Sequence, residues 1–140
     1  MRGRSESSAK LFLTELMIAI FFFALVAAVC VQLFVEAHSM SVRSEEMIHS
    51  VNIAANVAEC YSGWDFREES WQQLFPEGNW QDDTWQMYYD EEWRPCVADG
   101  NYLLEMQLVK DDVLCEAHIT IKDCLEKELY SLITKRVCRK

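Results

Sequence analysis

The sequence predicts an α+β protein, with a long N-terminal helix, transmembrane in its first half, packed on a small antiparallel β-sheet. Three observations lead to this prediction. An apolar run fills residues 11–35, helix-like apolar spacing continues through residues 36–61 without proline or glycine, and three later segments alternate apolar with polar residues. Spacing of three and four indicates a helix, whereas alternation indicates strands with one buried face. The 140 residues allow one span and one small domain outside it.

The span is predicted at residues 11–35, LFLTELMIAIFFFALVAAVCVQLFV. A helix of this length measures about 37 Å at about 1.5 Å per residue, which exceeds a hydrocarbon core of about 30 Å. Glu15 is a carboxylate one turn inside the run, and an intramembrane acid is a functional hypothesis by default. The alternative is that its side chain snorkels to the headgroups. The predicted membrane-spanning residues include Leu11, Phe12, Leu16, Met17, Ile18 and Val35.

Residues 11–20, LFLTELMIAI, resemble the start of type IV pilins and of the pseudopilins of type II secretion and competence systems. Those proteins open with a short basic leader, a cleavage point and a hydrophobic helix whose fifth mature residue is glutamate. With Leu11 as the first mature residue, Glu15 takes that position. The resemblance implies a filament subunit in which this glutamate meets the terminal amine of a neighbour. It also implies partners: other pilin-like subunits, an inner-membrane assembly platform, membrane lipid and a prepilin peptidase.

The sequence departs from the family pattern at Lys10, because the family's peptidase cuts after a glycine. We therefore expect the leader, residues 1–10, to be retained or removed inefficiently, and Leu11 to be methylated only where it is cut. In an uncut chain the Lys10 ammonium can take the place of the terminal amine beside Glu15. The assembly residues implied by the resemblance are Lys10, Leu11 and Glu15.

Charge predicts the orientation of the span. Three basic residues against one acid precede it, and Glu36 and the pair Glu45-Glu46 follow it. The positive-inside tendency places the N-terminus in the cytoplasm and the C-terminal domain outside a bacterial cell membrane. A cleavable secretory signal is the alternative, but the run is long and lacks an A-x-A-like site. Residues 36–140 carry 10 basic and 21 acidic residues, and this balance argues against direct nucleic-acid binding.

The helix is expected to continue outside the membrane over residues 36–62 and to stop at Ser62-Gly63. Its apolar spacing predicts one face that packs on the following domain or on neighbouring subunits. This face comprises Met40, Met47, Val51, Ala54, Ala58 and Tyr61.

Residues 63–83 form a predicted connector that is rich in tryptophan. A short helix is expected from about Asp65, its cap, to Phe75, with Trp71, Leu74 and Phe75 buried. Tryptophans at this spacing also suit a carbohydrate platform or an interfacial belt, but core packing is the more frequent use.

Residues 84–140 are predicted to form the sheet. Thr84–Tyr89 reads as a strand, and Trp93–Val97 as a short return strand that Pro95 confines to an edge. Three longer strands follow the turn 99–101, and the turn 111–112 separates the first two of them. Their predicted buried faces are Tyr102, Leu104, Met106 and Leu108; then Val113, Cys115, Ala117, Ile119 and Ile121; then Leu129, Ile133 and Val137.

Six cysteines are present, Cys30 in the span and five beyond it. Five is an odd number, so at most two disulfides can form beyond the span with one thiol left over. The spacing suggests no zinc site or redox motif, and we expect reduced, packed thiols. The sequence holds no phosphate-binding loop, nucleophile elbow or H-E-x-x-H motif, and its three histidines stand apart. The acidic turns lack the alternating ligands of a calcium loop. We therefore expect neither an enzyme nor a resident cofactor or metal.

Two functions fit these features. One is a structural pilin-like subunit, a minor pilin or a pseudopilin, of a pilus, a secretion pseudopilus or a DNA-uptake filament. The other is a binding or sensing module whose acidic, tryptophan-rich domain is merely anchored by the helix. The carboxylate at Glu15 favours the first function, and Lys10 in place of glycine favours the second.

Overall fold

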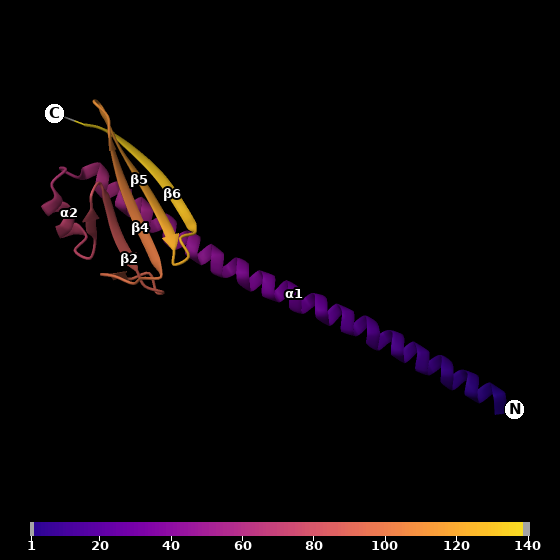
Figure 1. Ribbon diagram of the computed structural model, residues 1–140. Coiled ribbons are helices and arrows are strands. Elements are labelled where there is room, and N and C mark those ends of the chain that lie inside the picture. Colours follow the sequence, from indigo (N-terminus) through magenta and orange to yellow (C-terminus); the bar gives the residue numbers. More distant parts are fainter. Residues whose placement is uncertain (1, 139–140) are drawn as a thin grey trace. The chain divides into compact units, whose positions relative to one another are not determined.

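The computed structural model describes the backbone of residues 2–138 and the side chains of residues 7–138. The side chains of Arg2, Arg4 and Glu6 in the predicted leader, and the last two residues of the predicted sheet domain, lie outside this description. The chain forms two compact units, Met1–Arg43 and Ser44–Lys140. The elements, shown in Figure 1, are α1 (Arg2–Gly63), α2 (Glu68–Leu74), β1 (Asn79–Gln81), β2 (Thr84–Tyr89), β3 (Pro95–Cys96), β4 (Tyr102–Lys110), β5 (Leu114–Asp123) and β6 (Glu128–Val137).

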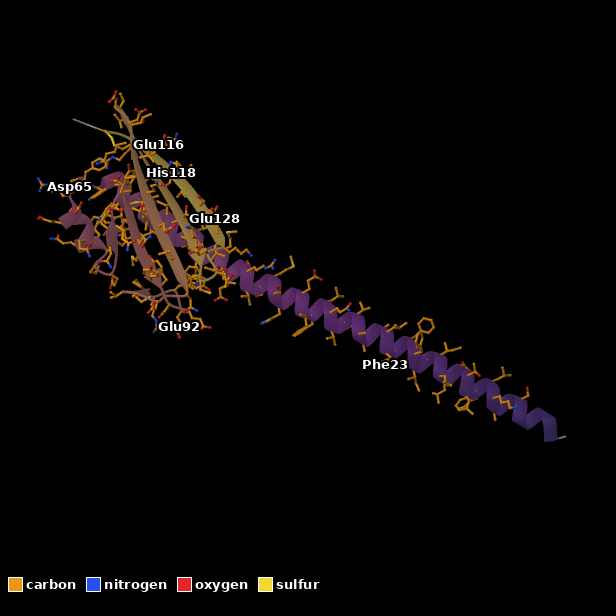
Figure 2. The ribbon with its side chains drawn as sticks, viewed as in Figure 1. Phe23, Asp65, Glu92, Glu116, His118 and Glu128 are labelled. Carbon is orange, nitrogen blue, oxygen red and sulfur yellow. A yellow bond between two sulfur atoms is a disulfide. The ribbon has the colours of Figure 1, made fainter. Side chains whose placement is uncertain are left out.

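The first unit is helical throughout its described residues. Helix α1 begins at Arg2 rather than at Leu11, and the predicted span therefore lies inside a longer helix. Its apolar side chains are exposed all round, and this helix is long and apolar enough to cross a membrane. A helix that is apolar on every face needs a lipid or protein environment to cover it. Figure 2 shows the Phe23 side chain projecting from this part of α1.

The second unit is an antiparallel sheet covered by the end of α1. The strand order is β1-β2-β4-β5-β6. Strand β3 pairs with the last two residues of β2, past the segment that pairs with β1. The predicted strand at residues 84–89, the three-strand meander and the edge position of Pro95 are all confirmed. Strand β1 was not predicted, because three residues are too few to show an alternation.

One hydrophobic core joins α1, α2 and the inner face of the sheet. Figure 1 shows the end of α1 behind β4 and β5. Of the connector tryptophans, Trp64 and Trp71 are buried in this core and Trp80 packs against it partly buried, which agrees with core packing; Trp85 of β2 is also buried. The core also includes Tyr61, Phe75, Met87, Tyr89, Leu104, Met106, Ala117, Ile119 and Ile121.

The predicted buried face of α1 is partly wrong. Ala54 and Tyr61 are fully buried, but Met47 and Val51 are 48% and 36% exposed; Met40, 69% exposed, belongs to the first unit. The buried stripe instead runs through Ser50, Ala54, Val57 and Tyr61. Ser50 is tolerated there because its hydroxyl donates to the Glu46 carbonyl at 2.7 Å.

The short helix is confirmed, with two corrections. Trp71 and Phe75 are buried, whereas Leu74 is 56% exposed because it lies on the flank of the helix that faces solvent. The N-cap residue is Arg67 rather than Asp65, and no side chain caps it. The Asp65 carboxylate holds the preceding loop instead, by accepting bonds from the Arg67 backbone N–H at 3.1 Å and from the Ser70 hydroxyl.

The buried face of the last strand was predicted one residue out of phase at Ile133 and Val137, whereas Leu129 is partly buried and packs against the core as predicted. Ile133 and Val137 are 52% and 62% exposed. The register places Leu132 opposite the buried Ile119, and Thr134 opposite the buried Ala117. A slip of one residue moves every side chain to the other face of a sheet, and a register shift between Ile121 and Lys122 removes Leu129 from the regular pairing. On the preceding strand, Val113 lies outside β5 and is 63% exposed.

The expectation of reduced thiols is wrong for one pair. Cys115, at the start of β5, forms a disulfide with Cys138, which directly follows β6. The pair was not predicted because the register that brings the two residues together depends on long-range strand pairing. The other cysteines, Cys30, Cys60, Cys96 and Cys124, are free.

Candidate functional site

The predicted membrane-spanning residues all lie on the open surface of α1. Leu11, Phe12 and Met17 are 67–70% exposed, and Leu16, Ile18 and Val35 range from 47% to 63%. Since no described residue covers them, these side chains are available to lipid or to other helices.

Glu15 is surrounded on its own helix by apolar side chains. Residues three and four positions away on a helix are surface neighbours. For Glu15 they are Leu11, Phe12, Ile18 and Ala19. The carboxylate is exposed, and these apolar neighbours provide no hydrogen-bond donor for it.

Lys10 is not placed to neutralise Glu15 within one chain. A separation of five residues turns the helix by about 140°, so the two side chains leave different faces. Among the side chains of residues 7–138, neither Lys10 nor Glu15 takes part in an ion pair. The Lys10 carbonyl instead accepts a bond from the Thr14 hydroxyl at 2.9 Å. Of the predicted assembly residues, Leu11 and Glu15 share one helix face, and Lys10 lies off it.

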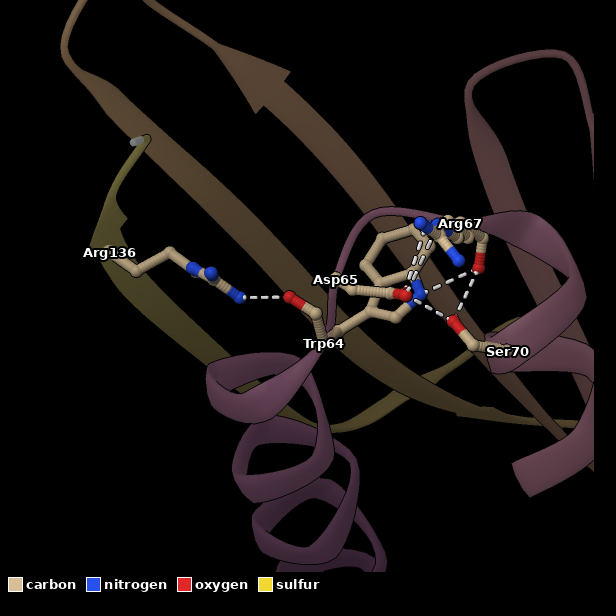
Figure 3. A network of polar contacts seen from close by, with 5 residues as sticks. All are labelled: Trp64, Asp65, Arg67, Ser70 and Arg136. Atoms are coloured by element: carbon tan, nitrogen blue, oxygen red, sulfur yellow. Dashed lines mark hydrogen bonds and ion pairs between the residues drawn. The ribbon is translucent and has the colours of Figure 1, made fainter. Parts of the chain in front are cut away.

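The end of α1 is held by Arg136 of β6. Figure 3 shows its contact with the carbonyl of Trp64, the residue that follows the helix. The Arg136 Nη1 group donates to the carbonyls of Tyr61 at 2.8 Å and Trp64 at 2.7 Å. Carbonyls at a helix C-terminus lack partners within the helix, so the guanidinium acts as a cap supplied from another element. Its Cζ atom also lies 4.6 Å from the centroid of the Phe66 ring. Burial raises the pKa of the Tyr61 phenol, and Arg136 acts in the opposite direction.

A second contact joins α1 to the sheet near the start of the second unit. The Tyr102 hydroxyl donates to Glu46 Oε1 at 3.2 Å. The Trp93 ring stacks on Tyr102 with centroids 3.8 Å apart, and the His49 ring stacks on Trp93 at 5.4 Å. Burial and then the Glu46 carboxylate raise the pKa of Tyr102 to about 12.

The outer face of the sheet is polar and carries two small charge networks. Lys122 pairs with Glu105, and Lys135 pairs with Glu116 at 2.6 Å. His118 lies 3.3 Å from Glu116 (Figure 2). Bonds from Lys135 and then His118 lower the pKa of Glu116. These five side chains therefore have partners on the face itself.

Two acidic turns use a carboxylate to hold their own backbone. Asp90 accepts bonds from the backbone N–H groups of Glu92 and Arg94, both at 2.9 Å. Asp123 does the same for Leu125 and Lys127. Within residues 7–138, no group of three or more His, Cys, Asp or Glu side chains could hold a metal ion.

Sequence reasoning missed the two side chains that fix α1 to the sheet, Arg136 and Glu46. Arg136 stands at an inward position of a strand, where a cation is unusual, but that signal requires the correct phase of β6. Glu46 is separated by 56 residues from its partner, and no local pattern links them.

Comparison with protein-family models, with curated proteins and with solved structures finds no match to this chain.

Proposed function

We propose that this chain is a structural subunit of a pilin-like filament, a minor pilin or a pseudopilin, anchored by α1 in a bacterial cell membrane. The role is structural rather than enzymatic. The N-terminus lies in the cytoplasm and residues 44–140 lie outside, as the charge bias across the span indicates. Its partners are other pilin-like subunits through α1, an inner-membrane assembly platform and, where the leader is cut, a prepilin peptidase.

The observation that carries the proposal is the position of Glu15. A carboxylate at the helix centre costs about 2.5–3.5 kcal/mol on insertion scales, and less near an interface. Its helix neighbours are apolar and Lys10 leaves another face. A group on an adjacent helix, the Lys10 ammonium or a free terminal amine, compensates the charge if subunits pack side by side. A simple anchor has no use for an acid at this depth.

The test replaces Glu15 and measures assembly through a thiol already present in the span. Cys30 is free and exposed, so a bifunctional thiol reagent reports neighbouring helices once Cys60, Cys96 and Cys124 are changed to serine. We expect Glu15→Ala to lower the Cys30 crosslinked fraction several-fold while membrane insertion is unchanged, because removing a charge cannot hinder insertion.

Gln32→Ala is the matched control, since Gln32 is a polar residue near the other end of the same run. We expect it to crosslink like the parent chain. Equal crosslinking by the Glu15→Ala variant and the parent would favour the alternative, a membrane-anchored binding module in which α1 only holds the domain at the surface.

A further inference from the structure

A cavity of about 340 Å³ opens beside the end of α1, between the loop before α2, the turn joining β1 to β2, and the end of β4. Aromatic rings form one wall. Trp64 and Trp80 stack with their centroids 5.9 Å apart and their planes at 19°, and Phe66 lies 5.2 Å from Trp64. These rings belong to the hydrophobic core or pack against it, so the wall is continuous with the folded domain.

The rim of the cavity carries more negative than positive charge. Glu68, Asp82 and Asp83 line it and are exposed, and Lys110 is its one lysine or arginine. Among residues 7–138, none of these four side chains forms an ion pair. The outer face of the sheet differs, because Glu105 and Glu116 already have partners there.

The wall is fixed before any ligand arrives. The Trp64 indole N–H donates to the Arg67 carbonyl at 2.8 Å, and the Trp64 carbonyl accepts from Arg136 (Figure 3). Phe66 and Asp82 both have left-handed backbones, with φ of 61° and 53°. A bulky residue rarely adopts this conformation. The buried Trp80 Nε1 atom has no hydrogen-bond partner in the part of the chain described.

We propose that this cavity binds an organic cation of the alkylammonium class. The face of an aromatic ring attracts such a group through its quadrupole, whereas the edge does not, and desolvation strengthens the attraction to the face. The surplus carboxylates on the rim add a charge of the complementary sign. The source of the cation is either a lysine side chain of a partner protein or a small quaternary amine, and both present the same chemistry to the site.

Lys110 makes it possible to test whether the cavity prefers a positive or a negative ligand. Its Nζ atom lies 5.8 Å from the centroid of the Phe66 ring, at the edge of the same cavity. An entering cation is repelled by this ammonium and attracted by the carboxylates. Removing Lys110 and removing the acids should therefore change the affinity in opposite directions, whereas an anion site would show both signs reversed.

The experiment follows the indole N–H resonances of Trp64 and Trp80 by NMR, using the full chain in non-ionic detergent. The probes are choline, its uncharged isostere 3,3-dimethylbutan-1-ol, Nα-acetyl-lysine methylamide and acetate. We expect saturable shifts with choline or the lysine amide and none with the isostere or acetate. Tighter binding of the lysine amide identifies a protein side chain as the source, and tighter binding of choline identifies a small amine.

Three variants complete the test. Asp82→Asn with Asp83→Asn should weaken the better cation at least about fivefold at low salt, because two attractive charges are lost near the ligand. Asparagine tolerates the left-handed backbone at residue 82, so the turn is preserved. Lys110→Gln should tighten binding.

Glu91→Gln with Glu92→Gln, the matched control, removes the same charge from the turn between β2 and β3 and should leave the affinity unchanged. Equal shifts with the isostere, weaker binding of the cation after Lys110→Gln, or saturable binding of acetate would overturn the proposal. Since no readout here involves α1 before residue 44, the result is independent of whether the chain forms filaments.

Discussion

Arg136 is the residue on which the end of α1 depends most directly. It supplies two hydrogen bonds to carbonyls of residues 61 and 64 and covers the Phe66 ring. Lys135, its neighbour in sequence, faces the other side of β6 and pairs with Glu116 on the exposed outer face. Adjacent basic residues therefore have different structural roles, because successive side chains of a strand point to opposite faces.

We expect Arg136→Met to lower the free energy of unfolding by about 2 kcal/mol, because a charged donor is lost and two carbonyls are left without it. Lys135→Met should lower it by less than about 1 kcal/mol, as is typical of exposed ion pairs. Urea unfolding of the full chain in non-ionic detergent, followed by tryptophan fluorescence, measures both. Equal losses for the two variants would show that the Arg136 contacts do not stabilise the domain.

Tyr102 gives a prediction for alkaline pH. Its pKa in the folded protein is about 12, above the ordinary value of 10. A raised pKa means that folding favours the neutral phenol, so the stability from this group is present below pH 10 and is lost as the pH rises toward about 12. Phenolate absorbance followed against pH should show that Tyr102 loses its proton at a higher pH than an ordinary tyrosine.

Glu46→Gln should bring the ionisation of Tyr102 to lower pH, because the carboxylate contributes to the raised pKa. Tyr89 is the internal control. Its pKa is also about 12, but burial and then Glu77 raise it, so Glu46→Gln should not affect it. If Glu46→Gln leaves the pKa of Tyr102 unchanged, the hydrogen bond from Tyr102 to Glu46 is not formed.

At the scale of elements, the part of α1 that packs on the sheet buries small side chains as well as large ones. Ser50 and Ala54 are fully buried beside Val57 and Tyr61. Small residues at these positions allow the helix backbone to approach the sheet closely, and a larger side chain has no room without moving it.

We expect Ala54→Leu to destabilise the second unit by about 1–3 kcal/mol through overpacking. Ala55→Leu adds the same atoms at the next position, which is exposed, and should change stability by no more than about 0.5 kcal/mol. Thermal unfolding of the two variants provides the comparison. A larger effect at residue 55 than at residue 54 would contradict the observed face of α1.

At the scale of the whole molecule, the chain consists of two units that differ in which apolar side chains they expose. The first exposes apolar side chains on every face of a helix, whereas the second has its own core. Among residues 7–138, all the buried hydrophobic residues lie between Ala54 and Ile121, within the second unit. We therefore expect the second unit to fold without residues 11–35.

A fragment of residues 39–140 should accordingly be soluble, monomeric and mixed in helix and strand by circular dichroism, with one cooperative unfolding transition. A fragment of residues 59–140 lacks Ala54 and Val57 and leaves the inner face of the sheet uncovered, so it should aggregate. Aggregation of the longer fragment, or a featureless spectrum, would place the domain boundary elsewhere.

The sequence by itself determined the class of fold, the long apolar N-terminal helix and most strand positions, because these features depend on local spacing that recurs over many residues. Local spacing did not determine the phase of β6, the buried stripe of α1, the Cys115–Cys138 disulfide or the Arg136 cap. Each of these joins residues distant in the chain. Only the tertiary structure decided them, because the pairing register and the packing of α1 on the sheet select which face of each element is buried.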